Sequence, residues 1–238
     1  MSAKKHTCVL CSTQVRKATG EHALPEQVLK LLGDANDRSL GKDAYDMHAL
    51  TYRGTKGQEA KKLDNALSAI RVPCCVDCNQ WLNETYEKPA AEHLPKLIEG
   101  QALFTSNQDE LAPLSRWIIK TVLMCNHPRV HYSGMTWKAK ADFPYSEHVP
   151  NLLNDLRKLR ELPHHLSLWA TFAINGELAT LLPGPDATIK MGVNIRRPDG
   201  LLQLTVTDSS DVSVMHVDGR LPPVRKLWPV CAGCTSCS

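Results

Sequence analysis

The stretch "VPCCVDCNQW", residues 72–81, places three cysteines and an asparagine close together. Cys75 and Cys78 form a C-x2-C pair, a spacing at which two thiolates can chelate one metal ion. A second pair with this spacing, Cys8 and Cys11, stands near the start of the chain. Four thiolates complete a tetrahedral zinc site. We therefore expect a structural zinc ion bound by these two pairs.

One alternative ligand lies inside the same stretch. Cys74 could replace Cys75, although C-x3-C matches the usual spacing less well. The interval between the two pairs is longer than in a short zinc ribbon. A small subdomain must therefore fill it.

The end of the chain carries three more soft ligands in "CAGCTSCS" and no obvious fourth: Cys231, Cys234 and Cys237. Cys125 or His127 could complete a second zinc site with them. A frayed terminus is an equally good interpretation.

Composition sets the broad class of protein. The 238 residues suit one large domain or two small ones, and the formal net charge of +3 is too weak to indicate nucleic-acid binding by itself. No apolar run is long enough to span a bilayer, and the polar start "MSAKKHTCVL" does not resemble a signal peptide. We expect a cytoplasmic protein without a membrane partner, whose cysteines are thiols or metal ligands instead of disulfides.

Hydrophobic patterning predicts an α+β fold. Short strands are expected within residues 16–25 and 66–73, and a long polar loop over 34–62. The spacing of apolar residues predicts helices over 25–33, 78–89, 90–103, 109–126 and 147–162. Alternating, β-branched segments predict antiparallel strands over 166–174, 187–197, 201–207 and 212–217. The predicted domains are a zinc-bound module over 1–90, a helical segment over 91–163 and an antiparallel β region over 164–238.

The order of the motifs points to a family. In "GEHALPEQV", residues 20–28, Glu21 stands beside His22, and Asn79 directly follows the second cysteine pair. A cysteine pair, an acid–histidine pair and a second cysteine pair followed by asparagine resemble the HNH or ββα-metal endonucleases, in a branch distantly like endonuclease VII. "EHxxP" and "CxxCN" also resemble a bacterial and phage HNH family. That family commonly carries a later "W-x-x-K" helix, which Trp117 and Lys120 match.

The resemblance implies a zinc-stapled ββα-metal module that hydrolyses phosphodiester bonds. Glu21 and Asn79 would supply hard oxygen ligands to one catalytic Mg²⁺ or Mn²⁺ ion. His22 would act as general base, because its unperturbed pKa lies near neutrality.

A further ligand of the catalytic ion is expected on the helix that Asn79 begins. Asn83 lies one turn further along the same face and is the first choice. Glu84 and Glu87 are alternatives, and regular helix geometry points Glu87 slightly away from Asn79.

The expected substrate is DNA, with RNA left open, and a homodimer is also left open. The expected phosphate contacts are basic residues of the 34–62 insert and of the later helix: Lys56, Lys61, Lys62 and Lys120. The simpler interpretation makes Trp117 a core aromatic and Lys120 a surface amine. The alternative function is a catalytically inactive zinc module that binds DNA or a protein partner. Such a module has no need of His22 as a base, so this residue discriminates between the two.

Overall fold

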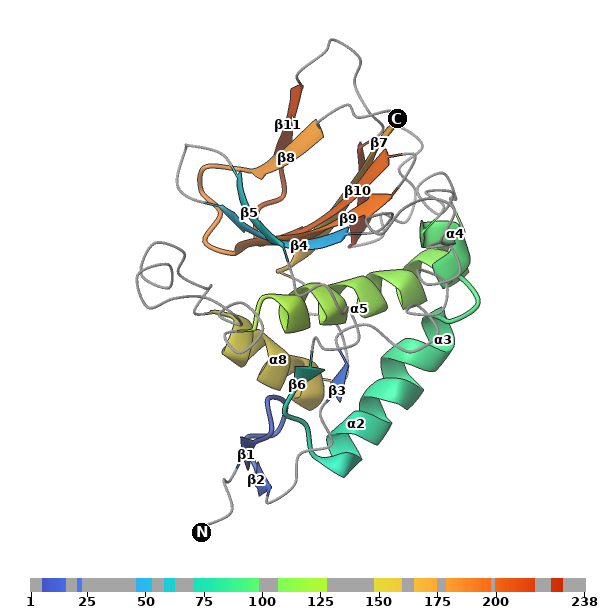
Figure 1. Cartoon of the computed structure of the whole chain (residues 1–238), viewed down its shortest axis with the longest axis vertical. Helices are drawn as coiled ribbons and strands as arrows, with labels where there is room; N and C mark the ends of the chain where they lie inside the picture. Colours follow the sequence, from blue (N-terminus) through green and yellow to red (C-terminus); the bar gives the residue numbers. More distant parts are fainter. Residues whose placement is uncertain are drawn as a thin grey trace.

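The computed structural model describes eleven segments of the chain, and everything below concerns these: 6–15, 21–22, 46–52, 58–62, 71–98, 107–127, 148–159, 165–174, 179–197, 200–216 and 224–228. Figure 1 shows a sheet with helix α5 (Gln108–Cys125) across one face and a two-stranded pair on the other. The small cysteine-bearing elements lie on the far side of α5, together with helix α8 (His148–Leu159). The fold is therefore α+β, as the patterning predicts.

The main sheet has six antiparallel strands in the order β12-β7-β10-β9-β4-β5. In chain order its strands are β4 (Asp46–Tyr52), β5 (Gln58–Lys62), β7 (Ser167–Ile174), β9 (Lys190–Arg197), β10 (Gly200–Thr207) and β12 (Val224–Trp228). The smaller pair is β8 (Ala179–Pro183) with β11 (Val212–His216). The predicted strands β7, β9, β10 and β11 are thus confirmed.

The two faces of the sheet differ in polarity, as strand β10 shows. Leu202, Leu204 and Val206 are buried and belong to the core cluster that also contains the apolar face of α5. The alternate residues of β10 are also buried but polar, and Gln203 accepts a hydrogen bond from the backbone N–H of Leu181 in β8. The period of two along the strand therefore sends apolar side chains toward α5 and polar ones toward the β8–β11 pair.

The prediction of one long loop over residues 34–62 is wrong for β4 and β5. Strand β4 pairs with β9, and its Met47 and Ala49 lie opposite the buried residues Ile195 and Val193. Strand β5 is the polar segment "QEAKK" and forms one edge of the sheet. Polar edge strands carry little hydrophobic alternation, so the local sequence does not reveal them.

The insert therefore joins the sheet formed by the C-terminal strands. Residues 46–62 stand between the two halves of the cysteine motif in sequence, yet β4 hydrogen-bonds to β9. One sheet is thus built from parts of the chain that the patterning assigns to different predicted domains.

The helices agree with the apolar spacing wherever the structure describes them. Besides α5 and α8 these are α2 (Val76–Leu82), a π-helical turn η3 (Asn83–Glu87), α3 (Lys88–Ala90) and α4 (Leu94–Ile98). The helix predicted over 25–33 lies outside the described residues. None of the described helices is both long and apolar enough to cross a membrane.

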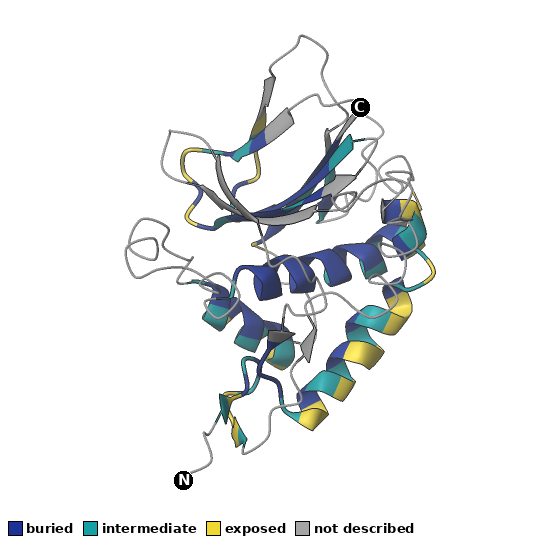
Figure 2. Ribbon diagram, viewed as in Figure 1, coloured by how far each residue is buried: buried dark blue, intermediate teal, exposed yellow. Residues whose placement is uncertain are grey.

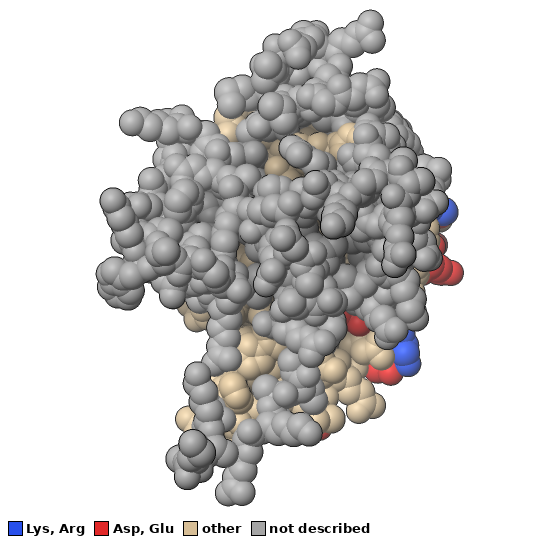
Figure 3. Space-filling view, in the orientation of Figure 1, with Lys and Arg blue, Asp and Glu red and all other residues tan. Residues whose placement is uncertain are grey.

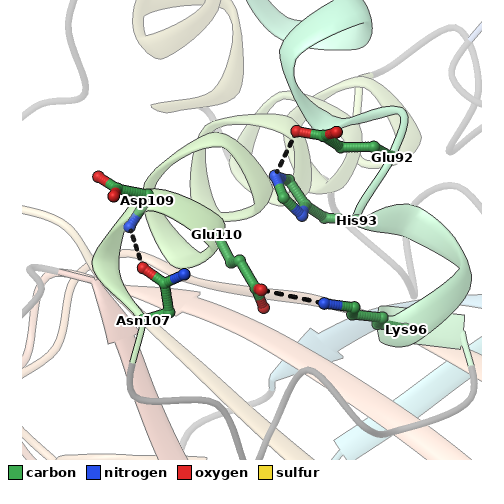
Figure 4. Close-up of polar contacts among 6 residues, drawn as sticks. All are labelled: Glu92, His93, Lys96, Asn107, Asp109 and Glu110. Atoms are coloured by element: carbon green, nitrogen blue, oxygen red, sulfur yellow. Dashed lines mark hydrogen bonds and ion pairs between the residues drawn. The ribbon is translucent and has the colours of Figure 1, made fainter.

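Helix α5 begins at a capped and charged end (Figure 4). The Asn107 side chain accepts a hydrogen bond from the Asp109 backbone N–H at 3.0 Å, which satisfies one otherwise orphaned donor. Lys96 of α4 forms a 2.9 Å ion pair with Glu110. Further along, α5 is buried almost all round, as the dark ribbon in Figure 2 shows. One core cluster extends from Cys8 to Leu227 and joins the cysteine-bearing elements to the sheet.

Candidate metal centre

The first cysteine pair lies in a tight turn. Strands β1 (His6–Thr7) and β2 (Gln14–Val15) form a short antiparallel pair, and the turn between them carries Cys8 and Cys11. The Cys8 N–H donates to the Thr13 carbonyl at 2.9 Å, and the Ser12 N–H donates to the Cys8 carbonyl at 3.0 Å. Ser12 adopts a φ of 60°, which is uncommon for a residue with a side chain. This backbone holds both sulfurs on one side of the turn.

The second pair lies at the start of α2. Cys75 is the N-cap residue, and its sulfur accepts a hydrogen bond from the Cys78 N–H at 3.4 Å. The Val9 N–H donates to the Pro73 carbonyl at 3.0 Å and so ties the two turns together directly. The two cysteine pairs therefore face each other through backbone contacts that do not need a metal.

The four predicted ligands converge. The sulfurs of Cys8, Cys11, Cys75 and Cys78 all lie within 4.8 Å of one another, and those of Cys11 and Cys75 are 3.8 Å apart. A tetrahedral site with zinc–sulfur bonds of about 2.3 Å requires sulfur–sulfur separations of roughly 3.8 Å. The geometry thus fits a metal ion such as zinc. It also favours Cys75 over Cys74 as the fourth ligand.

The surroundings of the cluster shift the pKa values of its thiols in opposite directions. Cys74 is buried, and its sulfur lies 4.0 Å from that of Cys8. The contact with Cys74 lowers the pKa of Cys8 to about 3. Burial raises the pKa of Cys75 and of Cys78. A divalent cation at the centre would favour the deprotonated form of all four thiols.

The acid–histidine motif is placed beside this centre by its backbone. Strand β3 (Glu21–His22) pairs antiparallel with β6 (Arg71–Val72), with Glu21 opposite Val72 and His22 opposite Arg71. The chain continues from β6 through the second cysteine pair into α2. Both predicted short strands are confirmed where described. The side chains of Glu21 and His22 lie outside the described part.

Asn79 directly follows the second cysteine pair, and its side-chain oxygen is one of several buried polar atoms without a partner among the described residues. Its backbone N–H donates to the Cys75 carbonyl at 2.9 Å, so the cysteine turn fixes its position. Its side-chain oxygen is buried and has no hydrogen-bond partner in the structure as described. An unsatisfied buried polar atom typically costs about 1–3 kcal/mol. The sequence predicts this oxygen as a ligand of the catalytic ion, and an ion at this point would remove that cost.

The π-turn η3 changes which residues share a face with Asn79. The Lys88 N–H donates to the Asn83 carbonyl five residues earlier, so the helix absorbs one extra residue here. In a regular α-helix Glu87 would lie about 80° around the axis from Asn79, whereas one absorbed residue reduces the offset to roughly 20°. The expectation that Glu87 points away from Asn79 is therefore wrong. Asn83, the first choice as further ligand, is exposed.

The two alternative acids are both engaged by lysines. Glu84 pairs with Lys88 at 2.6 Å on the surface. Glu87 pairs with Lys120 at 2.8 Å, and the Lys120 side chain is completely buried. The expected core position of Trp117 is confirmed, but Lys120 is neither the surface amine of the simpler interpretation nor exposed for the expected phosphate contact. The Glu87 carboxylate compensates the charge that burial of Lys120 would otherwise leave uncompensated.

The remaining predicted contacts lie apart from the metal centre or outside the described residues. Lys61 and Lys62 belong to the edge strand β5, while Lys56 and the three tail cysteines are not described. Acidic and basic side chains visible in Figure 3 lie next to one another along the edge formed by the helices. Cys125 is wholly buried in α5, and burial raises its pKa to about 12.

Comparisons with protein-family models, with curated proteins and with solved structures found no match. The functional interpretation therefore rests on the residues alone. Sequence reasoning missed one residue near the cluster, Arg157 of α8, whose guanidinium lies over the ring of Trp81 in the helix that carries Cys78. No local motif marks it, because it is one of several basic residues on an amphipathic helix.

Proposed function

We propose that this protein is a metal-dependent endonuclease of the HNH type that hydrolyses phosphodiester bonds in DNA. The observation that carries the proposal is the buried, unpartnered side-chain oxygen of Asn79. It belongs to the residue that the motif assigns to the catalytic ion, and it lies directly after the cysteine cluster. A structural asparagine in this place would normally use its oxygen in a hydrogen bond.

The order of the elements also supports the proposal. An antiparallel pair, β3 and β6, precedes helix α2, which is the ββα order that the resemblance implies. The cysteine cluster joins the loop before β3 to the start of α2. It would thus hold the acid–histidine strand and the asparagine helix in one unit.

Each residue would have a distinct role in the reaction. Glu21 and Asn79 would hold the divalent cation through a carboxylate and an amide oxygen. His22 would accept the proton of the attacking water. A bound Mg²⁺ or Mn²⁺ ion would stabilise the added charge on the phosphate and assist the leaving oxygen. Glu87 is aligned with Asn79 along the helix, but its charge is already compensated by Lys120, so it serves to hold this face of the helix in place.

Asn79→Ala tests the proposal most specifically. Wild-type protein should nick or cut plasmid DNA only with Mg²⁺ or Mn²⁺, and Asn79→Ala should require a higher metal concentration for half-maximal rate. Gln80→Ala, at the exposed next position, is the matched control and should behave as wild type. An RNA substrate of equal length in a parallel reaction decides between the two nucleic acids.

Two results would count against the nuclease. Cleavage that persists in EDTA, or an Asn79→Ala protein with wild-type metal dependence, would contradict the assigned role of Asn79. Zinc-loaded protein that binds DNA without cutting it under any metal would favour the inactive binding module instead.

A further inference from the structure

Helix α8 packs against the four-cysteine cluster and contributes a cation to it. Arg157, near the end of this helix, faces α2, the helix that begins at the second cysteine pair and carries Cys78. Its guanidinium also lies over the ring of Trp81, 4.7 Å from the ring centroid. Trp81 in turn contacts Tyr86 edge-on, with their ring centroids 5.3 Å apart. Trp81 stands three residues after Cys78, so Arg157 is held against α2 about one turn from this cysteine.

A second contact joins α8 to the other cysteine turn. With its amide oriented to satisfy both of its neighbours, Asn154 donates to the Leu10 carbonyl at 3.0 Å and accepts from the Lys158 ammonium at 3.1 Å. Leu10 stands between Cys8 and Cys11 in the first turn and is buried. One face of α8 therefore contacts the first cysteine turn and the helix that begins at the second.

Charge explains why an arginine suits this position. Four thiolates around one Zn²⁺ ion leave a net charge of −2 that is partly removed from water. Donors to the sulfurs stabilise that charge, and such outer contacts tune the metal affinity of the ligands. An arginine is suited to a half-buried position beside such a charge, because it stays charged while it stacks on an aromatic face.

We propose that Arg157 is a positioning residue for the zinc ion: it compensates the charge of the loaded tetrathiolate and so couples metal binding to the docking of α8. Loading then stabilises the contact between α8 and the cysteine turns, and loss of the ion weakens it. The proposal depends on the four-cysteine site and not on the nuclease activity.

The test measures zinc affinity by competition with a chromophoric chelator, in full-length protein whose tail cysteines 231, 234 and 237 are replaced by serine. Arg157→Met keeps the aliphatic stem and removes the charge and the donors. Its zinc dissociation constant should rise about 10- to 100-fold, the range typical of lost outer contacts. Lys88→Met removes the same charge from an exposed position of α3 and should remain within about twofold of wild type.

Two further measurements separate this role from simple packing. Cobalt-loaded Arg157→Met should keep the absorption bands of a tetrahedral tetrathiolate, which shows that the four ligands are unchanged. Hydrogen exchange in α8 should slow on zinc binding in wild type and much less in the variant. If Arg157→Met binds zinc as tightly as wild type, the proposal is overturned.

The proposal stays testable if Arg157→Met does not fold. Arg157→Lys keeps the positive charge and loses the planar stacking on Trp81. Zinc should then transfer to the chelator faster than from wild type. Equal transfer rates would overturn the proposal.

Discussion

Cys78 serves two structures at once. Its sulfur is one of the four that converge, and its side chain begins the buried stripe that α2, η3 and α3 present to the core. The candidate metal site and the core therefore meet in one residue. A metal bound only by the folded protein adds its binding free energy to folding.

Cys78→Ser should lose the zinc and the stabilisation that zinc provides. Wild-type protein should melt at a higher temperature with zinc than with EDTA, and the difference should vanish in the variant. Cys125→Ala removes a buried thiol outside the cluster and is the control, since it should keep one full equivalent of zinc at this site. Metal analysis together with thermal melting checks both. A Cys78→Ser protein with the native melting temperature and a full zinc content contradicts the assignment.

At the scale of residues, spacing predicted well which four sulfurs converge and predicted burial poorly. Two matched C-x2-C pairs determine which sulfurs can chelate, so Cys75 was preferred over Cys74 correctly. The burial of Lys120 depends on its ion pair with Glu87, which belongs to another helix. The sequence around Lys120 cannot predict a contact with a residue so far along the chain.

At the scale of elements, the π-turn keeps the apolar side chains of the α2–η3–α3 helix on the face that packs against the core. Cys78, Leu82, Tyr86 and Ala90 are all buried although they are spaced by four residues. In a regular α-helix Ala90 would lie about 120° around the axis from Cys78, and one absorbed residue reduces this to roughly 20°. The sequence predicted the helix itself. It did not predict the π-turn, because apolar residues spaced by four also fit a regular α-helix.

At the same scale, a hydrogen-bonded carboxylate holds the backbone that leads into β9. The Asp208 carboxylate accepts hydrogen bonds from the Thr188 and Ile189 backbone N–H groups, each at 2.9 Å, and from the Thr188 hydroxyl. Burial alone would raise the pKa of Asp208, but these hydrogen bonds outweigh it and hold the pKa below its ordinary value. The ionised carboxylate therefore stabilises the fold.

Asp208→Asn should be less stable than wild type at pH 7, by about 1 kcal/mol for a partly exposed charged acceptor. Because the folded pKa is lowered, this advantage of Asp is fully present above its unfolded pKa, near 4, and is lost as the pH falls through the folded value. Urea unfolding of both proteins between pH 7 and pH 2.5 measures it. A difference that is constant over this range contradicts the assigned role. Asp211→Asn, at a nearby exposed position, is the control.

At the scale of the whole molecule, the sheet and the cysteine-bearing elements share one core. Helix α5 lies between them, and the β4–β5 hairpin joins the sheet from within the N-terminal half of the chain. The strong helices and most of the C-terminal strands were predictable because each has a local hydrophobic period. The place of β4 was not, because its partner β9 lies far along the chain.

Deletion of residues 165–238 should therefore unfold more than the sheet. It removes the strands that cover Ile118 and Val122 of α5, and burial of each such side chain contributes about 1.5–3 kcal/mol. It also leaves β4 without β9. We expect the truncated protein to aggregate or to unfold without cooperativity, as measured by gel filtration and circular dichroism. A monomeric, cooperatively folding truncation would show that the N-terminal part is an independent domain.

The central claim is that the acid–histidine strand and the asparagine helix form a nuclease site. His22→Ala tests it most directly, through the cleavage rate of plasmid DNA under single-turnover conditions as a function of pH with saturating Mg²⁺ or Mn²⁺. Wild-type activity should rise through a titration near neutrality. His22→Ala should lose that rise and about 100- to 10,000-fold in rate while it binds zinc and DNA as before. A His22→Ala protein that cuts DNA at the wild-type rate contradicts the mechanism.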